Sequence, residues 1–142
     1  MHTVQSILSR KQRKPVAVSP DSSVRAALAC MAAEQIGSVV VMDGEKYLGI
    51  MTERDYSRKV ILRDKHSEST TVAEIMSTDL PAVAPGDSVE KCMQVMSGQN
   101  IRYMPVINNG QLAGIISMSD IVKEIILIQQ ETISHLESYI QQ

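Results

Sequence analysis

The sequence predicts an α+β fold in which two pseudo-symmetric β-α-β-β-α copies pack as one module. Three observations predict it: an internal repeat, apolar positions that change between helical and strand spacing, and turn residues in the same order in each copy. The chain has 142 residues, and a unit of about 60 residues buries too little of its surface to be stable alone. We therefore expect the two copies to share a core.

The internal repeat emerges when the chain is compared with itself at a shift of 65 positions. Residues 18–61 then match residues 83–126 without a gap, and 11 of the 44 positions are identical. Upstream, VQSIL at 4–8 resembles VAEIM at 72–76 at a shift of 68, so the first copy carries three extra residues. The match is too long for a chance similarity. The identical pairs include Pro20 with Pro85, Gly49 with Gly114 and Asp55 with Asp120.

A short amphipathic helix and then a brief strand, at 16–18 or 82–84, open each copy. A proline ends the strand, and we expect Ser22 and Asp87 to cap the next helix. Apolar residues three and four positions apart predict that helix. They are Val24, Ala27, Leu28 and Met31 in the first copy and Val89, Cys92, Met93 and Met96 in the second.

A β-hairpin is predicted after this helix, and a second helix follows it. Asp43-Gly44 separates the two strands of the first copy, and Asn109-Gly110 separates those of the second. Both dipeptides favour tight hairpin turns. The strands that they join are 38–42 and 47–51 in the first copy, and 103–107 and 112–116 in the second.

These elements divide the chain into four segments. They are repeat 1 at 1–62, a polar linker at 63–71, repeat 2 at 72–128 and a C-terminal helical extension at 129–142. Apolar residues keep helical spacing from Ile121 to Ile140, with no Gly or Pro after Gly114. An isolated helical overhang is marginal in water. We therefore expect the extension to dock on its own module or on another chain, most simply in a homodimer.

The composition excludes several classes of protein. The net charge of −2 gives no basic field for nucleic acid, and no run of about 18 apolar residues predicts a membrane span. The N-terminus has no signal-peptide pattern. Cys30 and Cys92 lie in helical patterns and are expected to be reduced thiols of a cytoplasmic protein, with a disulfide or metal pair as the alternative. Phe and Trp are absent and Met occurs nine times, which predicts an aliphatic, Met-rich core.

Catalysis is not expected. His2, His66 and His135 have no matching partner in the repeat, so no metal site and no nucleophile–base pair is predicted. The basic run from Arg10 to Lys14 is most simply a solvated loop, and otherwise part of a phosphate site or a partner surface. Without interleaved aromatic residues, it does not predict nucleic-acid binding.

Two heptapeptides carry the candidate chemistry: GIMTERD at 49–55 and GIISMSD at 114–120. In each, a Thr or Ser ends a strand and an Asp follows one helical turn later. The Asp could accept two hydrogen bonds from the vicinal diol of a ribose, with a phosphate near the helix terminus. The same spacing also describes a capping box, in which the acidic side chain binds the cap N–H. Residues alone leave both interpretations open.

The repeated element order, these heptapeptides and IRYMPVI at 101–107 resemble the tandem cystathionine β-synthase (CBS) domain pair, also called a Bateman module. The resemblance implies a regulatory, non-catalytic protein that binds an adenosine nucleotide, with AMP the first choice and NAD(H), ATP, ADP and S-adenosylmethionine open. It also implies a homodimer and an effector protein of unknown identity. A ligand-free structural dimerisation module is the alternative.

The resemblance also implies roles for individual residues. Ribose would contact Thr52, Asp55, Ser117 and Asp120. Phosphate would contact Arg54, Arg58, Arg102 and Lys123, with Arg102 reaching a phosphate held over Asp55. Because the second heptapeptide lacks an arginine, we expect the Asp55 site to favour the more highly charged ligand. The base would contact Val16, Ala17, Val18, Val39, Val40 and Ile50 in the first copy, and Ala82, Val83, Tyr103, Met104, Pro105 and Ile115 in the second.

Overall fold

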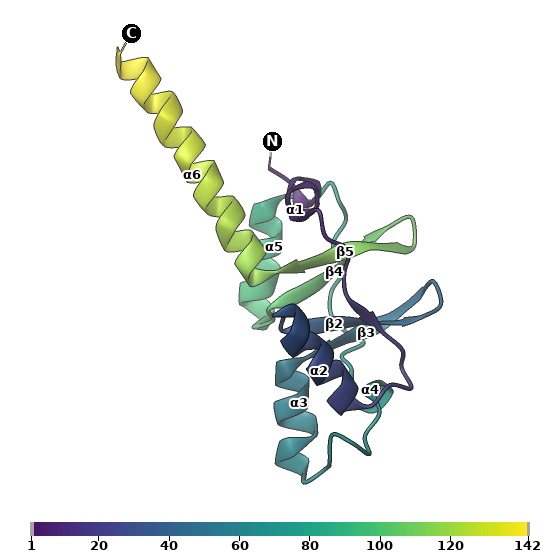
Figure 1. Cartoon of the computed structure of the whole chain (residues 1–142). Helices are drawn as coiled ribbons and strands as arrows, with labels where there is room; N and C mark the ends of the chain where they lie inside the picture. The colour runs from purple at the N-terminus through teal and green to yellow at the C-terminus, as the bar shows by residue number, and fades with distance from the viewer. Residues whose placement is uncertain (1, 142) are drawn as a thin grey trace. The chain divides into compact units, whose positions relative to one another are not determined.

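The computed structural model describes residues 2–141, which form two compact units (Figure 1). Unit 1 consists of Met1–Arg13 together with Pro81–Gln142, and unit 2 is Lys14–Leu80. Each unit contains both a small sheet and helices, which confirms the predicted α+β fold class.

Unit 2 has a three-stranded sheet in the order β1-β2-β3. β1 runs parallel to β2 with Ala17 opposite Val40, and β2 runs antiparallel to β3 with Ser38 opposite Thr52. The strands are β1 (Ala17–Val18), β2 (Ser38–Asp43) and β3 (Lys46–Thr52). The helices are α2 (Val24–Glu34), α3 (Glu53–Lys59), the 3-10 helix η1 (Ile61–Arg63) and α4 (Val72–Ile75).

Unit 1 repeats this plan with a shorter sheet. The antiparallel hairpin pairs Tyr103 with Ser117, and the strand predicted at 82–84 is reduced to one parallel bridge between Val83 and Val106. The strands are β4 (Tyr103–Asn108) and β5 (Gln111–Ser117). The helices are α1 (Val4–Lys11), α5 (Val89–Gln99) and α6 (Met118–Gln141).

The opening helices are exchanged between the repeats. Val4 and Ile7 of α1 belong to the core of unit 1, although they are part of the first repeat in sequence. Val72 and Ile75 of α4 likewise belong to the core of unit 2. The structure thus has one core cluster in each unit, where the sequence predicted a single shared core. Each small unit gains its missing apolar surface from a helix of the other repeat, which meets the same requirement for burial.

The predicted helix caps are displaced by one residue. Ser23 and Ser88 cap α2 and α5 by accepting hydrogen bonds from the N–H groups three residues ahead, so the predictions of Ser22 and Asp87 are wrong. Asp87 instead accepts a hydrogen bond from the Ala84 N–H at 2.8 Å, inside the turn before the helix. Residues that can cap a helix adjoin one another in each copy, at 21–23 and 86–88. The direction from which the chain enters the helix decides which of them is the cap.

The two hairpins confirm one predicted turn and shift the other. Asn109 and Gly110 both have positive φ, 53° and 77°, as the predicted Asn-Gly turn requires. In the first copy the strands end at Asp43 and resume at Lys46, so Gly44 and Glu45 form the turn rather than Asp43 and Gly44. Gly44 alone of these has positive φ, 60°, which suits a glycine at the first turn position.

Apart from Cys92 in unit 1, the buried residues of both cores are aliphatic or methionine, as predicted. Cys30 and Cys92 are free thiols in the structure. Burial raises the pKa of the Cys92 thiol, so it behaves as a packing residue. The second helix of repeat 2 and the predicted C-terminal extension form one continuous helix, α6.

Candidate functional site

The junction of β3 and α3 holds the first predicted Thr-x-x-Asp element. Thr52 is the N-cap of α3, and its hydroxyl accepts a hydrogen bond from the Asp55 N–H at 3.1 Å. The Asp55 Oδ2 atom accepts in return from the Thr52 N–H and the Thr52 hydroxyl, each at 3.0 Å. This is the reciprocal capping box that the spacing allowed.

The other carboxylate oxygen of Asp55 is also occupied. Oδ1 accepts a hydrogen bond from the Ser77 hydroxyl and an ion pair from Lys59 Nζ, each at 2.9 Å. Lys59 Nζ also donates to the carbonyl of Ile75 at 2.9 Å, at the end of α4. A carboxylate has about four lone-pair sites, and in Asp55, only 6% exposed, each oxygen already has two partners. A ribose diol could bind here only by displacing one of them.

The junction of β5 and α6 repeats the cap but leaves its aspartate more open. Asp120 Oδ2 accepts from the Ser117 N–H at 2.9 Å, and the Asp120 N–H donates to the Ser117 hydroxyl at 3.1 Å. Lys11 Nζ binds the same Oδ2 at 2.9 Å and the Ile115 carbonyl at 2.8 Å. The Asp120 side chain is 13% exposed, and within residues 2–141 its Oδ1 has no hydrogen-bond partner.

Three residues of these junctions were missed by sequence reasoning. Ser77 and Lys59 complete the Asp55 cluster, and Lys11 completes that of Asp120. Lys11 belongs to the basic run, whose second interpretation was a part in a phosphate site. The offset between the repeats offered no signal for Lys59, because its counterpart at the shift of 65 is Glu124.

The predicted phosphate ligands lie on the outside of their units. Arg58, Arg102 and Lys123 are exposed, and Arg54 is half-buried on α3. Arg102 belongs to unit 1 and Asp55 to unit 2, and a shared phosphate stays a prediction.

The predicted base contacts differ in burial. Val39, Val83 and Met104 are members of the two cores, so packing accounts for them. Their role toward a base stays a prediction, as it does for the other candidates. Of these, Val40, Ile50, Pro105 and Ile115 are buried, Val16, Val18 and Tyr103 are half-buried, and Ala17 and Ala82 are exposed.

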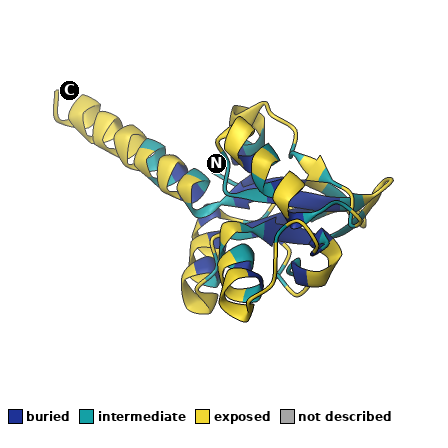
Figure 2. Cartoon of the chain, turned by 60° about the horizontal axis from the view of Figure 1, so that its bottom comes forward, coloured by how far each residue is buried: buried dark blue, intermediate teal, exposed yellow. Residues whose placement is uncertain are grey.

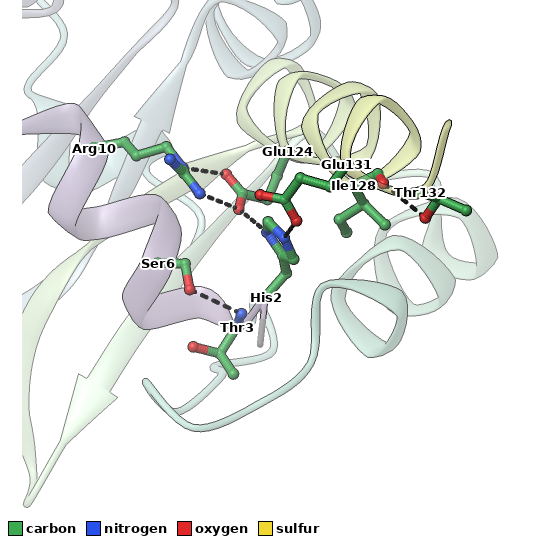
Figure 3. A network of polar contacts seen from close by, with 8 residues as sticks. All are labelled: His2, Thr3, Ser6, Arg10, Glu124, Ile128, Glu131 and Thr132. Carbon is green, nitrogen blue, oxygen red and sulfur yellow. Dashed lines mark hydrogen bonds and ion pairs between the residues drawn. The ribbon is translucent and has the colours of Figure 1, made fainter. Parts of the chain in front are cut away.

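A polar cluster of unit 1 joins the N-terminal segment to α6 (Figure 3). Glu124, 2% exposed, accepts an ion pair from Arg10 at 2.9 Å and binds His2 Nδ1, whose other nitrogen lies 2.7 Å from Glu131. Burial acts to raise the pKa of Glu124, but the hydrogen bonds from Arg10 and His2 outweigh it and hold the pKa below its ordinary value. Hydrogen bonds to Glu124 and Glu131 raise the pKa of His2. The cluster ties α1 to α6.

Two further features of residues 2–141 bear on other functions. No group of three or more His, Cys, Asp or Glu side chains there could hold a metal ion. No helix in that range is long and apolar enough to cross a membrane.

Comparison with known proteins identifies the family to which the two repeats belong. The CBS domain model matches residues 4–61 and 72–127. A solved CBS-domain structure is 41% identical, covers 89% of this chain and 99% of its own, and has a TM-score of 0.83. A protein with CBS domains from Burkholderia ambifaria, whose name proposes a role in signal transduction, is 37% identical over 88% of this chain and 94% of its own, with a TM-score of 0.82.

A mitochondrial CBS domain-containing protein of Arabidopsis thaliana is 37% identical over 126 residues, 85% of this chain. The chain spans 61% of the length of that relative. Nucleotide binding is typical of the family, and its members commonly form oligomers. With two matched domains, a repeated fold and repeated strand-to-helix junctions, the chain belongs to the CBS domain family as a tandem pair.

Proposed function

We propose that the protein is a regulatory, non-catalytic adenosine-nucleotide sensor of the cytoplasm, with AMP as its first ligand. ADP, ATP, NAD(H) and S-adenosylmethionine are the other candidates. Binding would change a surface that an effector protein reads. That step requires the ligand to bind two states of the protein with different affinity.

The observation that carries the proposal is the one-sided hydrogen bonding of Asp120. Its Oδ2 is held by Ser117 and Lys11, while Oδ1 is available among the described residues. A ribose diol supplies the hydroxyl donors that such an oxygen accepts. Lys11 Nζ and the N-terminus of α6 supply positive charge for a phosphate beside it. We therefore propose Asp120 as the first ribose contact, with Ser117 beside it.

Asp55 is proposed as the weaker ribose contact. Binding there would cost the hydrogen bond from Ser77 or the ion pair with Lys59. The arginines near Asp55 had favoured the β3–α3 junction, and the hydrogen bonds favour the β5–α6 junction instead. The reason is that the partners a carboxylate already has decide how many further hydrogen bonds it can accept. Arg54, Arg58, Arg102 and Lys123 remain proposed phosphate contacts.

Isothermal titration calorimetry with AMP, ADP, ATP, NAD, NADH and S-adenosylmethionine tests the proposal. Asp120→Asn is expected to weaken binding by about 1.5–3 kcal/mol, the usual scale for a hydrogen bond to a charged group. Asp55→Asn is the matched variant at the other junction and is expected to weaken it less. If none of these ligands binds the wild-type protein at millimolar concentration, the proposal fails.

A structural dimerisation module is the second candidate, favoured by the fully occupied carboxylate of Asp55. In that case both aspartates only cap helices. Substituting either one would then lower thermal stability, and thermal shift assays with the same ligands would give no stabilisation of the wild type.

A further inference from the structure

The C-terminal half of α6 is exposed, and Glu131 joins it to the rest of its unit through His2. Ile121 and Glu124 are buried against unit 1, but every described residue from Gln129 to Gln141 is exposed (Figure 2). The helix continues past the rest of unit 1 (Figure 1). A helical segment of this length is marginal in water without tertiary packing. It therefore needs a surface to cover it.

A heptad pattern runs along this exposed helix. Six residues follow one another at intervals of 4, 3, 4, 3 and 4, which places them at alternating a and d positions of a coiled-coil seam. All six are exposed, with Leu136 at 57% and Ile140 at 79%. The seam spans about 27 Å of helix at 1.5 Å per residue. Its members are Val122, Ile126, Gln129, Ile133, Leu136 and Ile140.

The polar cluster holds α6 by the side opposite this seam. Glu124 and Glu131 are seven residues apart, at two successive f positions, and both bind His2. Arg10 contacts Glu124 on the same side (Figure 3). The contacts that fix α6 to its own unit therefore leave the a/d seam open.

We propose that α6 pairs with α6 of a second copy of this chain as an antiparallel two-stranded coiled coil. Isoleucine occupies the three a positions, and the d positions hold Val122, Gln129 and Leu136, so five of the six seam residues are apolar. In the antiparallel register that aligns the two seams over their whole length, each seam residue packs opposite one residue of the partner. The twofold axis repeats every such pair once. This register sets Ile126 opposite the partner's Leu136, Ile133 opposite the partner's Gln129 and Ile140 opposite the partner's Val122.

Charge complementarity selects the antiparallel direction. Lys123 and Glu137 occupy e positions that flank the two ends of the seam, and both are exposed. In the antiparallel pair, Lys123 faces Glu137 of the partner subunit, and the twofold axis forms this ion pair twice. In a parallel pair Lys123 would lie beside the partner's Met118 instead, and the two Gln129 side chains would stack. The ion pair would compete with a phosphate for Lys123, and the seam itself does not depend on nucleotide binding.

Analytical ultracentrifugation of the full chain without nucleotide tests the seam. Ile133→Asp places a charge at the centre of the seam in both copies. It is expected to weaken self-association through α6 at least about 100-fold, so that the assembly loses the α6–α6 contact. Ser138→Asp adds the same charge to the f side of the same helix and is the matched control, expected to stay within about twofold of wild type. Circular dichroism of both variants checks that the units remain folded. Equal association of Ile133→Asp and wild type, or a wild type that is monomeric at 100 μM (about the scale expected of a short seam), overturns the proposal.

Charge exchange tests the direction. Lys123→Glu and Glu137→Lys each replace two attractive pairs by two repulsive ones, and each is expected to weaken association about five- to tenfold. The double variant restores both pairs and is expected to return close to wild type. Single variants that leave the dissociation constant unchanged would overturn the antiparallel arrangement, because neither residue meets a charge in the parallel one.

Discussion

The strand-to-helix junctions of the two units have the same backbone and different chemistry. In both, a Thr or Ser caps the helix and an Asp returns to the cap N–H. At the β3–α3 junction the cation comes from the same helix, as Lys59. At the β5–α6 junction it comes from the exchanged helix α1, as Lys11.

The reason for this difference lies at one aligned position. Lys59 corresponds to Glu124 at the shift of 65, so the charge is reversed there. Glu124 turns to Arg10 and His2. Lys11 supplies the cation to Asp120 at Oδ2, whereas Lys59 binds Asp55 at Oδ1. Duplication of a fold therefore preserves the cap, which backbone geometry requires, while long charged side chains re-pair around it.

The largest effect is expected at the glycines that precede the two junctions. A Cβ at Gly49 would lie 2.5 Å from the backbone carbonyl oxygen of Ser77, whereas at Gly114 it would meet the Leu8 side chain at 2.7 Å. A backbone atom cannot move aside as a leucine can. Gly49→Ala is expected to lower the free energy of unfolding by about 3 kcal/mol and Gly114→Ala by about 1 kcal/mol. Urea denaturation measures both, and equal losses would show that the two contacts are equally rigid.

Substituting the aspartates should also destabilise the protein more at the β3–α3 junction than at the β5–α6 junction. Asp55→Ala removes four contacts and leaves the Ser77 hydroxyl and Lys59 without their acceptor, so we expect a loss of about 2–3 kcal/mol in stability. Asp120→Ala removes a cap and a partly exposed ion pair, for about 1 kcal/mol. Thermal and urea unfolding compare the two. A larger loss at Asp120 would contradict the difference in hydrogen bonding.

Substituting Lys11 or Lys59 tests which of the two junctions binds the phosphate of the proposed nucleotide. Lys11→Met is expected to weaken AMP binding about three- to tenfold, the range of a partly exposed charge contact, and to leave adenosine binding unchanged. Lys59→Met is the matched variant and is expected to spare both ligands, because Lys59 is tied to Asp55 and Ile75. Calorimetry with AMP and adenosine distinguishes them. The reverse ranking would move the phosphate to the β3–α3 junction.

The smallest effect concerns pH and belongs to unit 1 alone. Contacts with Glu124 and Glu131 raise the pKa of His2 above its ordinary 6.5, so its contribution to stability is complete below pH 6.5 and is lost as pH rises through the raised pKa. The pKa values of Glu124 and Glu131 are lowered from 4.5, so their contribution is lost only as pH falls below that value.

The melting-temperature difference between wild type and His2→Gln should therefore be largest between about pH 5 and 6.5 and shrink toward pH 9. Differential scanning fluorimetry across this range measures it, with His135→Gln, an exposed histidine of α6, as the control. A difference that grows with pH would mean that His2 acts without its charge.

Local patterns predicted much of the fold because they depend on neighbouring residues. The apolar spacing of α2 and α5, the Asn109-Gly110 turn and the Thr52–Asp55 capping box all follow from contacts within a few positions. The caps Ser23 and Ser88 and the Gly44 turn are each displaced by one residue, where several suitable residues adjoin, and the strand predicted at 82–84 is reduced to one bridge. Such choices are made by the path of the incoming chain.

The sequence by itself determined that the chain is a duplicated α+β protein rich in aliphatic residues and methionine, with a Thr/Ser-x-x-Asp element at each of two strand-to-helix junctions. Only the tertiary structure decided that α1 and α4 are exchanged, since a short amphipathic helix fits either core equally well. It also decided that Asp55 is saturated while Asp120 keeps an oxygen available. The partners of a flexible lysine or glutamate lie within reach of many residues, and only packing in three dimensions selects among them.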